Sequence, residues 1–378
     1  MNKVKHLIGI SGGKDSAALA IYLNERHPEL DLIYYFCDTG KELDETYQLI
    51  ENLEIYLGKK ITKLKPDDAK KADDNPFDHY YKAYRGYLPS SVARWCTKKM
   101  KLEPFENFVG DDPVVSYVGI RGDEDREGYI SKKSNIQSIF PFRKNIWSED
   151  VVRKVLANSN RGAFLDLYSS YASGSDLDKA SGIIKSTLSL ELRNPQQNKK
   201  AFHQKLNTLL DLGVARFNHA VFDYLKNTEY PLAQESDFAL LDNEDVLVKA
   251  DIFKTLEDSG VGVPQYYQEV QYEVDGQKGT YARSRSGCFF CFFQQKIEWI
   301  WLYEQHPERF KEAMKYEDEK QGFTWNQNES LKDLVEPKRM EQIKRDHLNK
   351  LQTKSNQGSD KLMDILDTGD VGCTACFV

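Results

Sequence analysis

The sequence predicts an α/β fold with a doubly wound, mostly parallel sheet, a helical insertion and a helical C-terminal part. Two observations lead to this fold class. In the first 150 residues, apolar runs typical of strands alternate with amphipathic segments typical of helices. In addition, a glycine pair follows the first apolar run and leads into an amphipathic segment, which indicates a strand–loop–helix unit. Such alternation is typical of a parallel sheet covered by helices on both faces.

The apolar runs define the elements in chain order. We expect strands over 5–10, 31–37, 60–65 and 114–120, and helices over 15–27, 42–57 and 98–109. In this architecture ligands bind at the carboxyl ends of the strands. The segments 11–16, 38–40 and 119–121 all follow expected strands, so we expect them to meet at one edge of the sheet.

Composition divides the chain into four parts. Residues 1–157 are expected to form the catalytic core. Residues 158–245 are helical in pattern and rich in Ser, Asn, Gln and Lys, which predicts an insertion, the alternative being that they belong to the core. Residues 246–350 would complete the catalytic fold and end in an aromatic-rich helical part over 293–350. Residues 351–378 are expected to be a linker, over 352–360, and a cysteine-containing tail.

The overall composition is that of a globular protein, with 40% hydrophobic and 29% charged residues. We expect a cytoplasmic protein without a membrane partner, because the sequence contains neither a membrane-length apolar run nor a signal-peptide pattern. The formal net charge of −7 argues mildly against a large DNA footprint. Basic stretches occur locally, at 98–101, 283–285 and 338–350. Runs of this kind are also typical of solvated helix faces.

The glycine pair belongs to the most informative motif in the chain. The motif consists of Ser11, Gly12, Gly13, Lys14, Asp15 and Ser16, here called the SGGKDS loop. Glycines let backbone N–H groups approach an anion, the helix N-terminus contributes positive potential, and Lys14 adds a full charge. These features predict a phosphate-binding loop, although the spacing is not that of a Walker A motif. The alternative is an ordinary glycine-rich turn with a surface lysine.

Two further segments carry residues suited to a nucleotide. Asp38 follows the second expected strand and could reach the nucleotide or a Mg²⁺ ion held between phosphates, the alternative being a turn or helix-capping residue. Gly119 and Arg121 follow the fourth expected strand. Arginine is suited to bidentate contacts with phosphate. The alternative for Arg121 is an ion-pair cluster with the neighbouring acids.

The cysteines indicate metal chemistry. Four of the six form two Cys-x-x-Cys pairs, Cys288/Cys291 and Cys373/Cys376. In the reducing environment expected here, such pairs favour a metal over a disulfide. Cys96 lies in a basic, aromatic segment, where a cysteine could be a metal ligand or a thiol that faces an anion. Cys37, at the end of an expected strand, is predicted to be packed in the core.

Together these motifs resemble the phosphoadenosine phosphosulfate reductase superfamily of PP-loop ATP pyrophosphatases. Within it, the large insertion, the single Cys96 and the aromatic Cys288–Cys291 turn are most similar to the DndC- and SspD-type proteins of bacterial DNA phosphorothioation. The C-terminal signature of sulfonucleotide reductases is missing. The phrases that carry the resemblance are SGGKDS, Asp38-Thr39-Gly40-Lys41-Glu42, Arg94-Trp95-Cys96-Thr97 with Lys101, Gly119-Ile120-Arg121, Pro141 with Trp147-Ser148-Glu149-Asp150-Val151, and Ser286-Gly287-Cys288-x-x-Cys291.

The resemblance implies a fold similar to the adenine nucleotide α-hydrolases and an ATP pyrophosphatase that adenylates a DNA backbone phosphate for sulfur incorporation. ATP and Mg²⁺ would bind at the SGGKDS loop, Asp38, Gly119 and Arg121, with Lys14, Asp15 and Arg121 catalytic. The implied partners are DNA, as a duplex or a single strand, a cysteine desulfurase and other phosphorothioation proteins. The alternative functions are a tRNA or small-molecule sulfurtransferase, a sulfonucleotide reductase, and a scaffold that binds nucleotide as a switch.

Three roles for the cysteines follow from the resemblance and the two-pair pattern. Cys96, Cys288, Cys291 and one of Cys373 and Cys376 could bind a [4Fe–4S] cluster. Alternatively, the two pairs could form a tetrahedral Zn²⁺ site, because both metals accept four cysteine ligands. As a third possibility, the tail pair could carry a persulfide. The oligomeric state is left open by the sequence.

Overall fold

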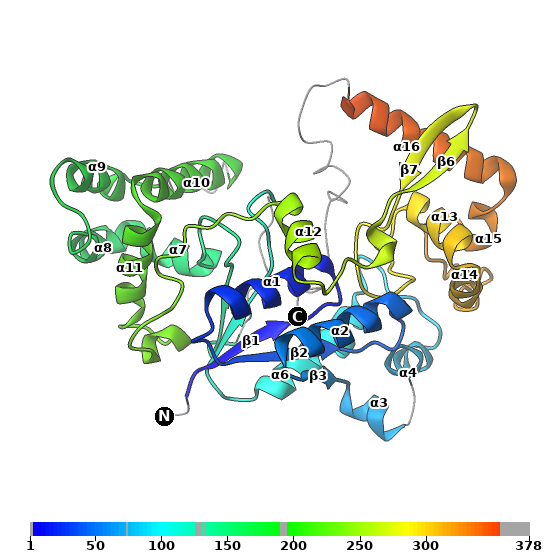
Figure 1. Cartoon of the computed structure of the whole chain (residues 1–378), viewed down its shortest axis with the longest axis horizontal. Helices are drawn as coiled ribbons and strands as arrows, with labels where there is room; N and C mark the ends of the chain where they lie inside the picture. Colours follow the sequence, from blue (N-terminus) through cyan, green and yellow to red (C-terminus); the bar gives the residue numbers. More distant parts are fainter. Residues whose placement is uncertain (1–2, 73–74, 125–130, 132, 190–194, 356–378) are drawn as a thin grey trace. The chain divides into compact units, whose positions relative to one another are not determined.

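The computed structural model of the chain describes residues 3–72, 75–124, 131, 133–189 and 195–355 (Figure 1). The described residues belong to two compact units. The first unit comprises the residues up to Ile8, Ala18–Ile33 and Asp111–Ile252, and the second comprises Gly9–Ala17, Tyr34–Gly110 and the residues from Phe253 onward. Within the described ranges, every helix is too short or too polar to cross a membrane.

The central sheet has five strands in the order β3-β2-β1-β4-β5. The pairs β1–β4, β4–β5 and β2–β3 are all parallel. The predicted α/β fold with a mostly parallel sheet is therefore confirmed, while β5 was not among the expected strands. The strands are β1 (Lys5–Gly9), β2 (Leu32–Cys37), β3 (Ile61–Leu64), β4 (Val114–Tyr117) and β5 (Ile136–Ile139).

The inner strands of the sheet are mostly buried on both faces, whereas Thr62 and Lys63 of the edge strand β3 are exposed. All residues of β4 and β5 are buried, and in β1 the exposed fractions of Leu7 and Ile8 are 1% and 0%. Burial on both faces is typical of parallel sheets covered by helices. The four strands expected from the sequence match β1 to β4 closely, because apolar runs of this length are a strong strand signal when they alternate with helices.

The first unit is mainly helical outside its strands. In Figure 1, α8, α9, α10 and α11 lie together as one helical group. Phe164 of α8 packs edge-on against Phe217 of α11, with ring centroids 5.8 Å apart. The helical character expected for 160–245 is confirmed, whereas the domain boundaries stay a prediction. The helices of this unit are α7 (Glu149–Val155), η2 (Asn158–Asn160), α8 (Arg161–Tyr168), α9 (Gly174–Lys185), α10 (Pro195–Leu212), α11 (Val214–Leu225) and η3 (Pro231–Gln234).

Two helices run from one unit into the other, α1 (Lys14–Arg26) and α12 (Lys249–Asp258). The predicted helices 15–27, 42–57 and 98–109 correspond to α1, α2 and the pair η1–α6. The remaining helices of the second unit's first half are α2 (Asp44–Leu57), α3 (Asp67–Lys71), α4 (Pro76–Ala83), α5 (Trp95–Thr97), the π-helical segment η1 (Lys98–Leu102) and α6 (Glu103–Val109).

The C-terminal part of the second unit contains a two-stranded antiparallel hairpin among its helices. No strand was expected in this part from the sequence pattern. Figure 1 shows this hairpin, β6–β7, beside α16. The expected helical part over 293–350 is confirmed, but α16 extends to Ser355, so the first residues of the expected linker are helical. The elements are η4 (Gln265–Tyr267), β6 (Val270–Val274), β7 (Gln277–Tyr281), α13 (Lys296–Gln305), α14 (Pro307–Met314), α15 (Leu331–Leu334) and α16 (Pro337–Ser355).

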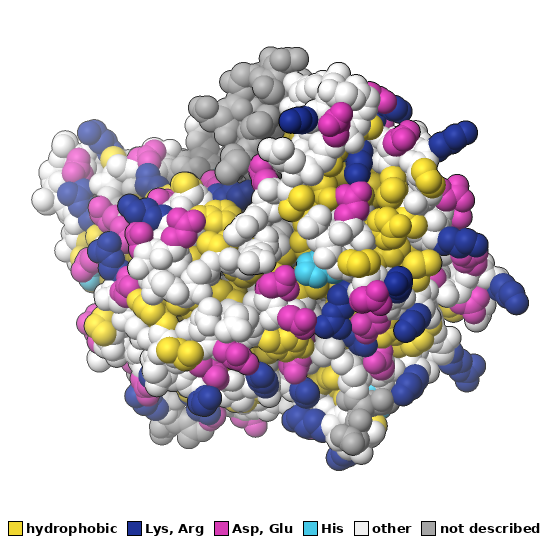
Figure 2. Space-filling model, turned by 45° about the vertical axis from the view of Figure 1, so that its right-hand side comes forward, with side chains coloured by type: hydrophobic (Ala, Val, Ile, Leu, Met, Phe, Trp, Pro, Cys, Tyr) yellow, Lys and Arg dark blue, Asp and Glu magenta, His cyan; other side chains and the backbone are white. Residues whose placement is uncertain are grey.

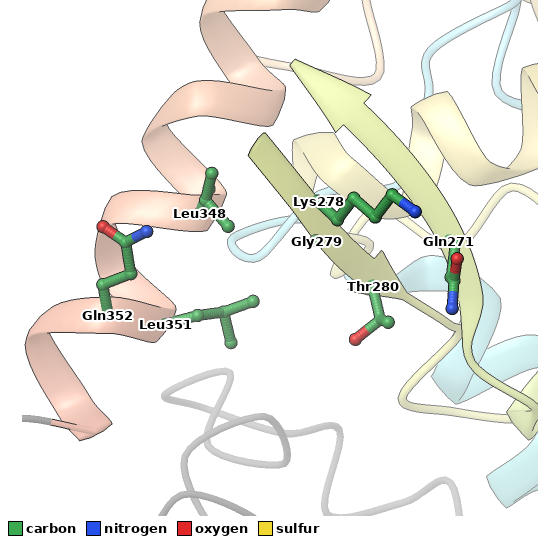
Figure 3. Close-up of a pocket in the computed structure, with 7 residues that line it drawn as sticks. All are labelled: Gln271, Lys278, Gly279, Thr280, Leu348, Leu351 and Gln352. Carbon is green, nitrogen blue, oxygen red and sulfur yellow. The ribbon is translucent and has the colours of Figure 1, made fainter. Parts of the chain in front are cut away.

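A groove of about 320 Å³ lies between this hairpin and the end of α16. Figure 3 shows Leu348 and Leu351 of α16 on one side and Gly279 and Thr280 of β7 on the other. Of the described residues, none that was expected to bind nucleotide or metal lines this groove.

Candidate functional site

The SGGKDS loop connects β1 to α1 and belongs to the second unit. The end of β1 is tied to β2 by a hydrogen bond from the Ile10 N–H to the Tyr35 carbonyl, 2.7 Å long. Ser16 fixes the loop from within: its hydroxyl accepts from the Ser11 N–H at 3.1 Å and donates to the Gly13 carbonyl at 3.1 Å. The first turn of α1 thus closes onto the loop and places its N–H groups at a helix N-terminus.

Close packing explains both glycines. Gly12 has a φ of 73°, and a Cβ atom there would lie 2.2 Å from Cγ2 of Thr46. At Gly13 a Cβ atom would lie 2.5 Å from the Ser286 hydroxyl oxygen, which also places Ser286 against the loop. The Tyr266 hydroxyl donates to the Gly12 carbonyl at 2.9 Å. A larger residue would therefore displace the backbone that is expected to surround a phosphate.

Lys14 is almost completely buried, with an exposed fraction of 2%. Its Nζ atom lies 3.4 Å from an Asp15 carboxylate oxygen and 4.7 Å from the centre of the Tyr267 ring. The Lys14 N–H donates to the Tyr267 hydroxyl over a long 3.4 Å contact. A surface lysine on an ordinary turn would be solvated, so this burial argues against that alternative. The charge is positioned beside the loop by a carboxylate and an aromatic face.

Asp38 follows β2 and is also buried, with 6% of its surface exposed. One carboxylate oxygen accepts from the Gly40 N–H at 2.9 Å and from the Tyr47 hydroxyl at 3.0 Å. The other lies 3.3 Å from Nζ of Lys65. The first of these bonds is the turn role that the sequence left as an alternative. The contact of Asp38 with nucleotide or Mg²⁺ stays a prediction.

A polar network joins the segment after β2 to the cysteine turn. The Thr39 hydroxyl donates to a Glu42 carboxylate oxygen at 2.5 Å and lies 3.1 Å from Sγ of Cys288. Tyr47 donates to the second Glu42 oxygen at 3.0 Å. Burial, followed by repulsion from the Asp38 carboxylate, raises the pKa of Glu42. Burial, followed by the charge of Glu42, likewise raises the pKa of the Cys288 thiol well above its usual value.

The Cys288–Cys291 turn is built into an aromatic core. A hydrogen bond of 3.2 Å from the Cys291 N–H to the Cys288 carbonyl closes the turn, and Arg283 donates to the same carbonyl at 3.0 Å. Between the cysteines, Phe290 packs on Phe77 and Trp325, with ring centroids 4.4 and 4.8 Å apart. The turn is therefore held by residues that are distant in the sequence.

The described cysteines include three of the predicted metal ligands, Cys96, Cys288 and Cys291. No disulfide joins Cys37, Cys96, Cys288 and Cys291 to one another. Among the described residues, no three Cys, His, Asp or Glu side chains converge well enough to hold a metal ion. Cys373 and Cys376 lie outside the described residues. The described residues thus do not by themselves fit a [4Fe–4S] cluster or Zn²⁺, and both stay predictions. Cys37 is buried with its thiol near the Lys101 carbonyl, as expected, and burial raises its pKa to about 12.

Gly119 and Arg121 follow β4 and belong to the first unit. Arg121 is buried, with an exposed fraction of 1%, and forms ion pairs with Asp123 at 2.9 Å and Glu124 at 2.8 Å. The structure therefore shows the ion-pair cluster that was the alternative for this arginine, in a buried rather than a surface form. Its contact with phosphate stays a prediction.

Three residues of the candidate site were not expected to belong to it. Glu42, Tyr266 and Tyr267 surround the SGGKDS loop and the cysteine turn through the contacts described above. Glu42 has the appearance of a helix-start acid in the sequence, and the two tyrosines lie more than 250 residues after the loop. No local pattern in the sequence marks the two tyrosines, which lie 16 or more positions before the basic segment 283–285.

Comparison with known proteins supports this assignment for the N-terminal part. The family model of the phosphoadenosine phosphosulfate reductase domain matches residues 5–149. An uncharacterised protein of Methanocaldococcus jannaschii is 31% identical over 157 residues, which cover 37% of this chain and 30% of that protein. The tRNA-specific 2-thiouridylase MnmA of Actinobacillus succinogenes is 22% identical over 171 residues, which cover 37% of this chain and 42% of that enzyme. No solved structure gives a significant match.

The matches are partial, since the chain spans less than half the length of these two relatives. The family model covers the region that contains β1, the SGGKDS loop, Asp38 and Arg121. The family match and the parallel sheet thus support a phosphoadenosine phosphosulfate reductase-like, PP-loop domain over residues 5–149, of a kind found in enzymes.

Proposed function

We propose that the protein is an ATP pyrophosphatase that adenylates a nucleic-acid acceptor for the incorporation of sulfur. The observation that carries this proposal is the SGGKDS loop at the carboxyl end of β1, with two tightly packed glycines and the buried Lys14. Backbone N–H groups and a helix N-terminus bind phosphate oxygens, and a preorganised lysine stabilises the charge that develops on a leaving pyrophosphate.

The proposed reaction has two displacement steps. An acceptor oxygen attacks the α-phosphorus of ATP, the bond between the α-phosphorus and its bridging oxygen breaks, and pyrophosphate leaves. A thiol reductant releases hydrosulfide from the persulfide of a cysteine desulfurase and is itself oxidised to a disulfide. This hydrosulfide then attacks the activated centre, and AMP leaves with the displaced oxygen. The two displacements at phosphorus change no oxidation state, because the thiol supplies the two electrons that reduce the persulfide sulfur. Mg²⁺, when bound, would neutralise phosphate charge, and Asp15 and Asp38 provide the oxygen ligands that this ion prefers.

A DNA backbone phosphate is the acceptor that we favour, on the resemblance to phosphorothioation proteins. The visible face in Figure 2 has no uniformly basic surface, because Lys and Arg side chains are interspersed there with Asp and Glu. From His79 to Leu102, however, the chain contains six Lys and Arg residues and no Asp or Glu. A basic segment without acids is suited to a nucleic-acid backbone.

A tRNA is the second candidate acceptor. The partial similarity to a tRNA-specific 2-thiouridylase, 22% identical over 171 residues, favours it. The two candidates differ in a simple assay. Stimulation of pyrophosphate release by DNA and not by tRNA would support phosphorothioation, and the reverse would support tRNA thiolation.

The central experiment measures pyrophosphate release from ATP by the full chain and by the variants Lys14→Ala and Asp15→Ala. We expect a loss of about 10³-fold in each variant, since a positioned charge in the transition state is worth several kcal/mol. Lys99→Ala is the matched control, because Lys99 pairs with Glu103 at 2.9 Å outside the loop. Unchanged release in both loop variants would refute the proposal. Nucleotide binding without any turnover would instead support a scaffold, and sulfite release would support a reductase.

A further inference from the structure

Arg94 has an unusual position for a cation. It immediately precedes α5, in the segment from His79 to Leu102 that contains no acidic residue. Its Nε and Nη2 atoms are buried, and neither has a hydrogen-bond partner in the part of the chain that the structure describes. Burying guanidinium donors without acceptors is costly, so such a group is normally paired. Among the described residues, no carboxylate forms an ion pair with Arg94.

A second arginine faces the same aromatic ring. The guanidinium carbon of Arg94 lies 5.3 Å from the centre of the Phe293 ring, and that of Arg285 lies 5.7 Å from it. Phe293 is only half-buried, so the ring is accessible to a ligand from outside. Two guanidinium groups around one ring combine charge with forked donors, an arrangement suited to the oxygens of a phosphate.

The pair adjoins the SGGKDS loop. Ser286, the residue after Arg285, is the one that a Cβ atom at Gly13 would meet at 2.5 Å. An anion held by Arg285 would therefore lie near the loop that is expected to bind the phosphates of ATP. This proximity is what an acceptor phosphate requires, because the reacting groups must be brought together.

Exposed aromatic side chains lie along the same segment. Tyr84 stacks on Trp95, the neighbour of Arg94, with ring centroids 5.2 Å apart, and Tyr84 and Tyr87 are 38% and 42% exposed. Exposed aromatic rings beside cations are typical of surfaces that stack nucleotide bases while binding the backbone. These rings favour a nucleic-acid phosphate over a free inorganic ion.

We propose that Arg94 and Arg285, whose guanidinium groups both lie next to the Phe293 ring, form an oxyanion site that binds a phosphate of the nucleic-acid acceptor. The inference rests on the proposed function for the identity of the acceptor. It assigns acceptor binding to residues outside the ATP loop, with Tyr84 and Tyr87 as the stacking surface next to the site.

The test measures binding of a fluorescent single-stranded oligonucleotide to the full chain by anisotropy. We expect Arg94→Gln to weaken binding about 10- to 100-fold, because hydrogen bonds to charged groups contribute that much. Arg94→Lys should be intermediate, since it keeps the charge and loses the fork. The matched control is Lys332→Gln, an exposed cation of α15 outside the basic segment, which should change affinity by less than about threefold. Binding of a fluorescent ATP analogue should be unchanged in all three variants.

Equal oligonucleotide affinity in wild type and Arg94→Gln would overturn the inference, as would an equal loss in Lys332→Gln. A second arm separates it from the proposed function. In Lys14→Gln protein, where the loop is weakened, inorganic phosphate should raise the melting temperature, and Arg94→Gln should abolish that rise. If wild type binds phosphate through Arg94 but binds no nucleic acid, the oxyanion site is supported and the nucleic-acid acceptor is refuted.

Discussion

The SGGKDS loop and the Cys288–Cys291 turn are neighbouring parts of the second unit that are stabilised in different ways. The loop is closed by its own Ser16, which bonds to Ser11 and Gly13, and its two glycines pack closely against residues from other parts of the chain. The cysteine turn is held by Thr39, Arg283 and a distant aromatic core. We infer that the loop is sensitive to changes in backbone space, whereas the cysteine turn is sensitive to the loss of polar partners far away in the sequence.

The largest expected effect is that of Gly12→Ala. A non-glycine residue at a φ of 73° costs about 1–2 kcal/mol, and the new Cβ atom would clash with Thr46, 2.2 Å away, for about 1–3 kcal/mol more. Chemical denaturation should show this loss of stability, together with loss of ATP binding. Gly58→Ala is the matched control, because Gly58 has a φ of 61° and open space around it.

Gly58→Ala should cost only about 1–2 kcal/mol, the backbone cost alone, and leave ATP binding intact. If the two variants lose equal stability and bind ATP equally well, the close packing at Gly12 does not support the loop. The inference that the loop is sensitive to changes in backbone space would then be wrong.

On the other side, Thr39→Val should destabilise the cysteine turn by about 2 kcal/mol, because the buried Glu42 carboxylate loses a hydroxyl donor. The same change removes the neighbour of the Cys288 thiol. Thr62→Val is the control, as Thr62 lies at an exposed position of β3. Chemical denaturation of reduced, chelator-treated protein measures the unfolding free energy of both variants. Equal stability of the two variants would mean that the polar network does not contribute to folding.

The same contrast explains what the sequence could predict. The loop and strands β1 to β4 were predictable because their signals are local: a glycine pair, a lysine and apolar runs of strand length. Strand β5, with the sequence Ile136-Gln137-Ser138-Ile139, has too few apolar residues to give such a signal. The hairpin β6–β7 was missed for a similar reason, since exposed polar residues interrupt it.

The parts of the site that were missed depend on long-range contacts. Glu42 reads as a helix-start acid until Tyr47 and Thr39 are seen to bond to it. Tyr266 and Tyr267 contact the loop only because the fold returns there after more than 200 residues. Arg94 is conspicuous only by the absence of a partner among the described residues, which no sequence pattern encodes.

The smallest expected effect is a difference in how stability depends on pH between the strand that leads into the loop and the network beside the cysteine turn. Burial, followed by repulsion from Lys3, lowers the pKa of His6 in β1 to about 4, from an ordinary value of 6.5. The stability linked to His6 is therefore present above pH 6.5 and is lost as the pH falls toward 4, because only the unfolded chain binds the proton. Between pH 7 and pH 5 this loss amounts to at most about 2 kcal/mol. His6→Asn should remove it while keeping a partner for the Tyr117 hydroxyl.

Glu42, beside the cysteine turn, should act with the opposite sign. Its pKa is raised by burial, so its contribution is present below the ordinary carboxyl pKa and is lost as the pH rises through the folded value. Denaturation of reduced, chelator-treated protein from pH 7 to pH 5 should give a shallower fall in stability for His6→Asn than for wild type, and a steeper fall for Glu42→Gln. Parallel curves of unfolding free energy against pH for the three proteins would show that neither buried group controls the loss of stability in acid. A change of the same sign in both variants would show that the strand below the loop and the network beside the cysteine turn do not differ electrostatically as their burial predicts.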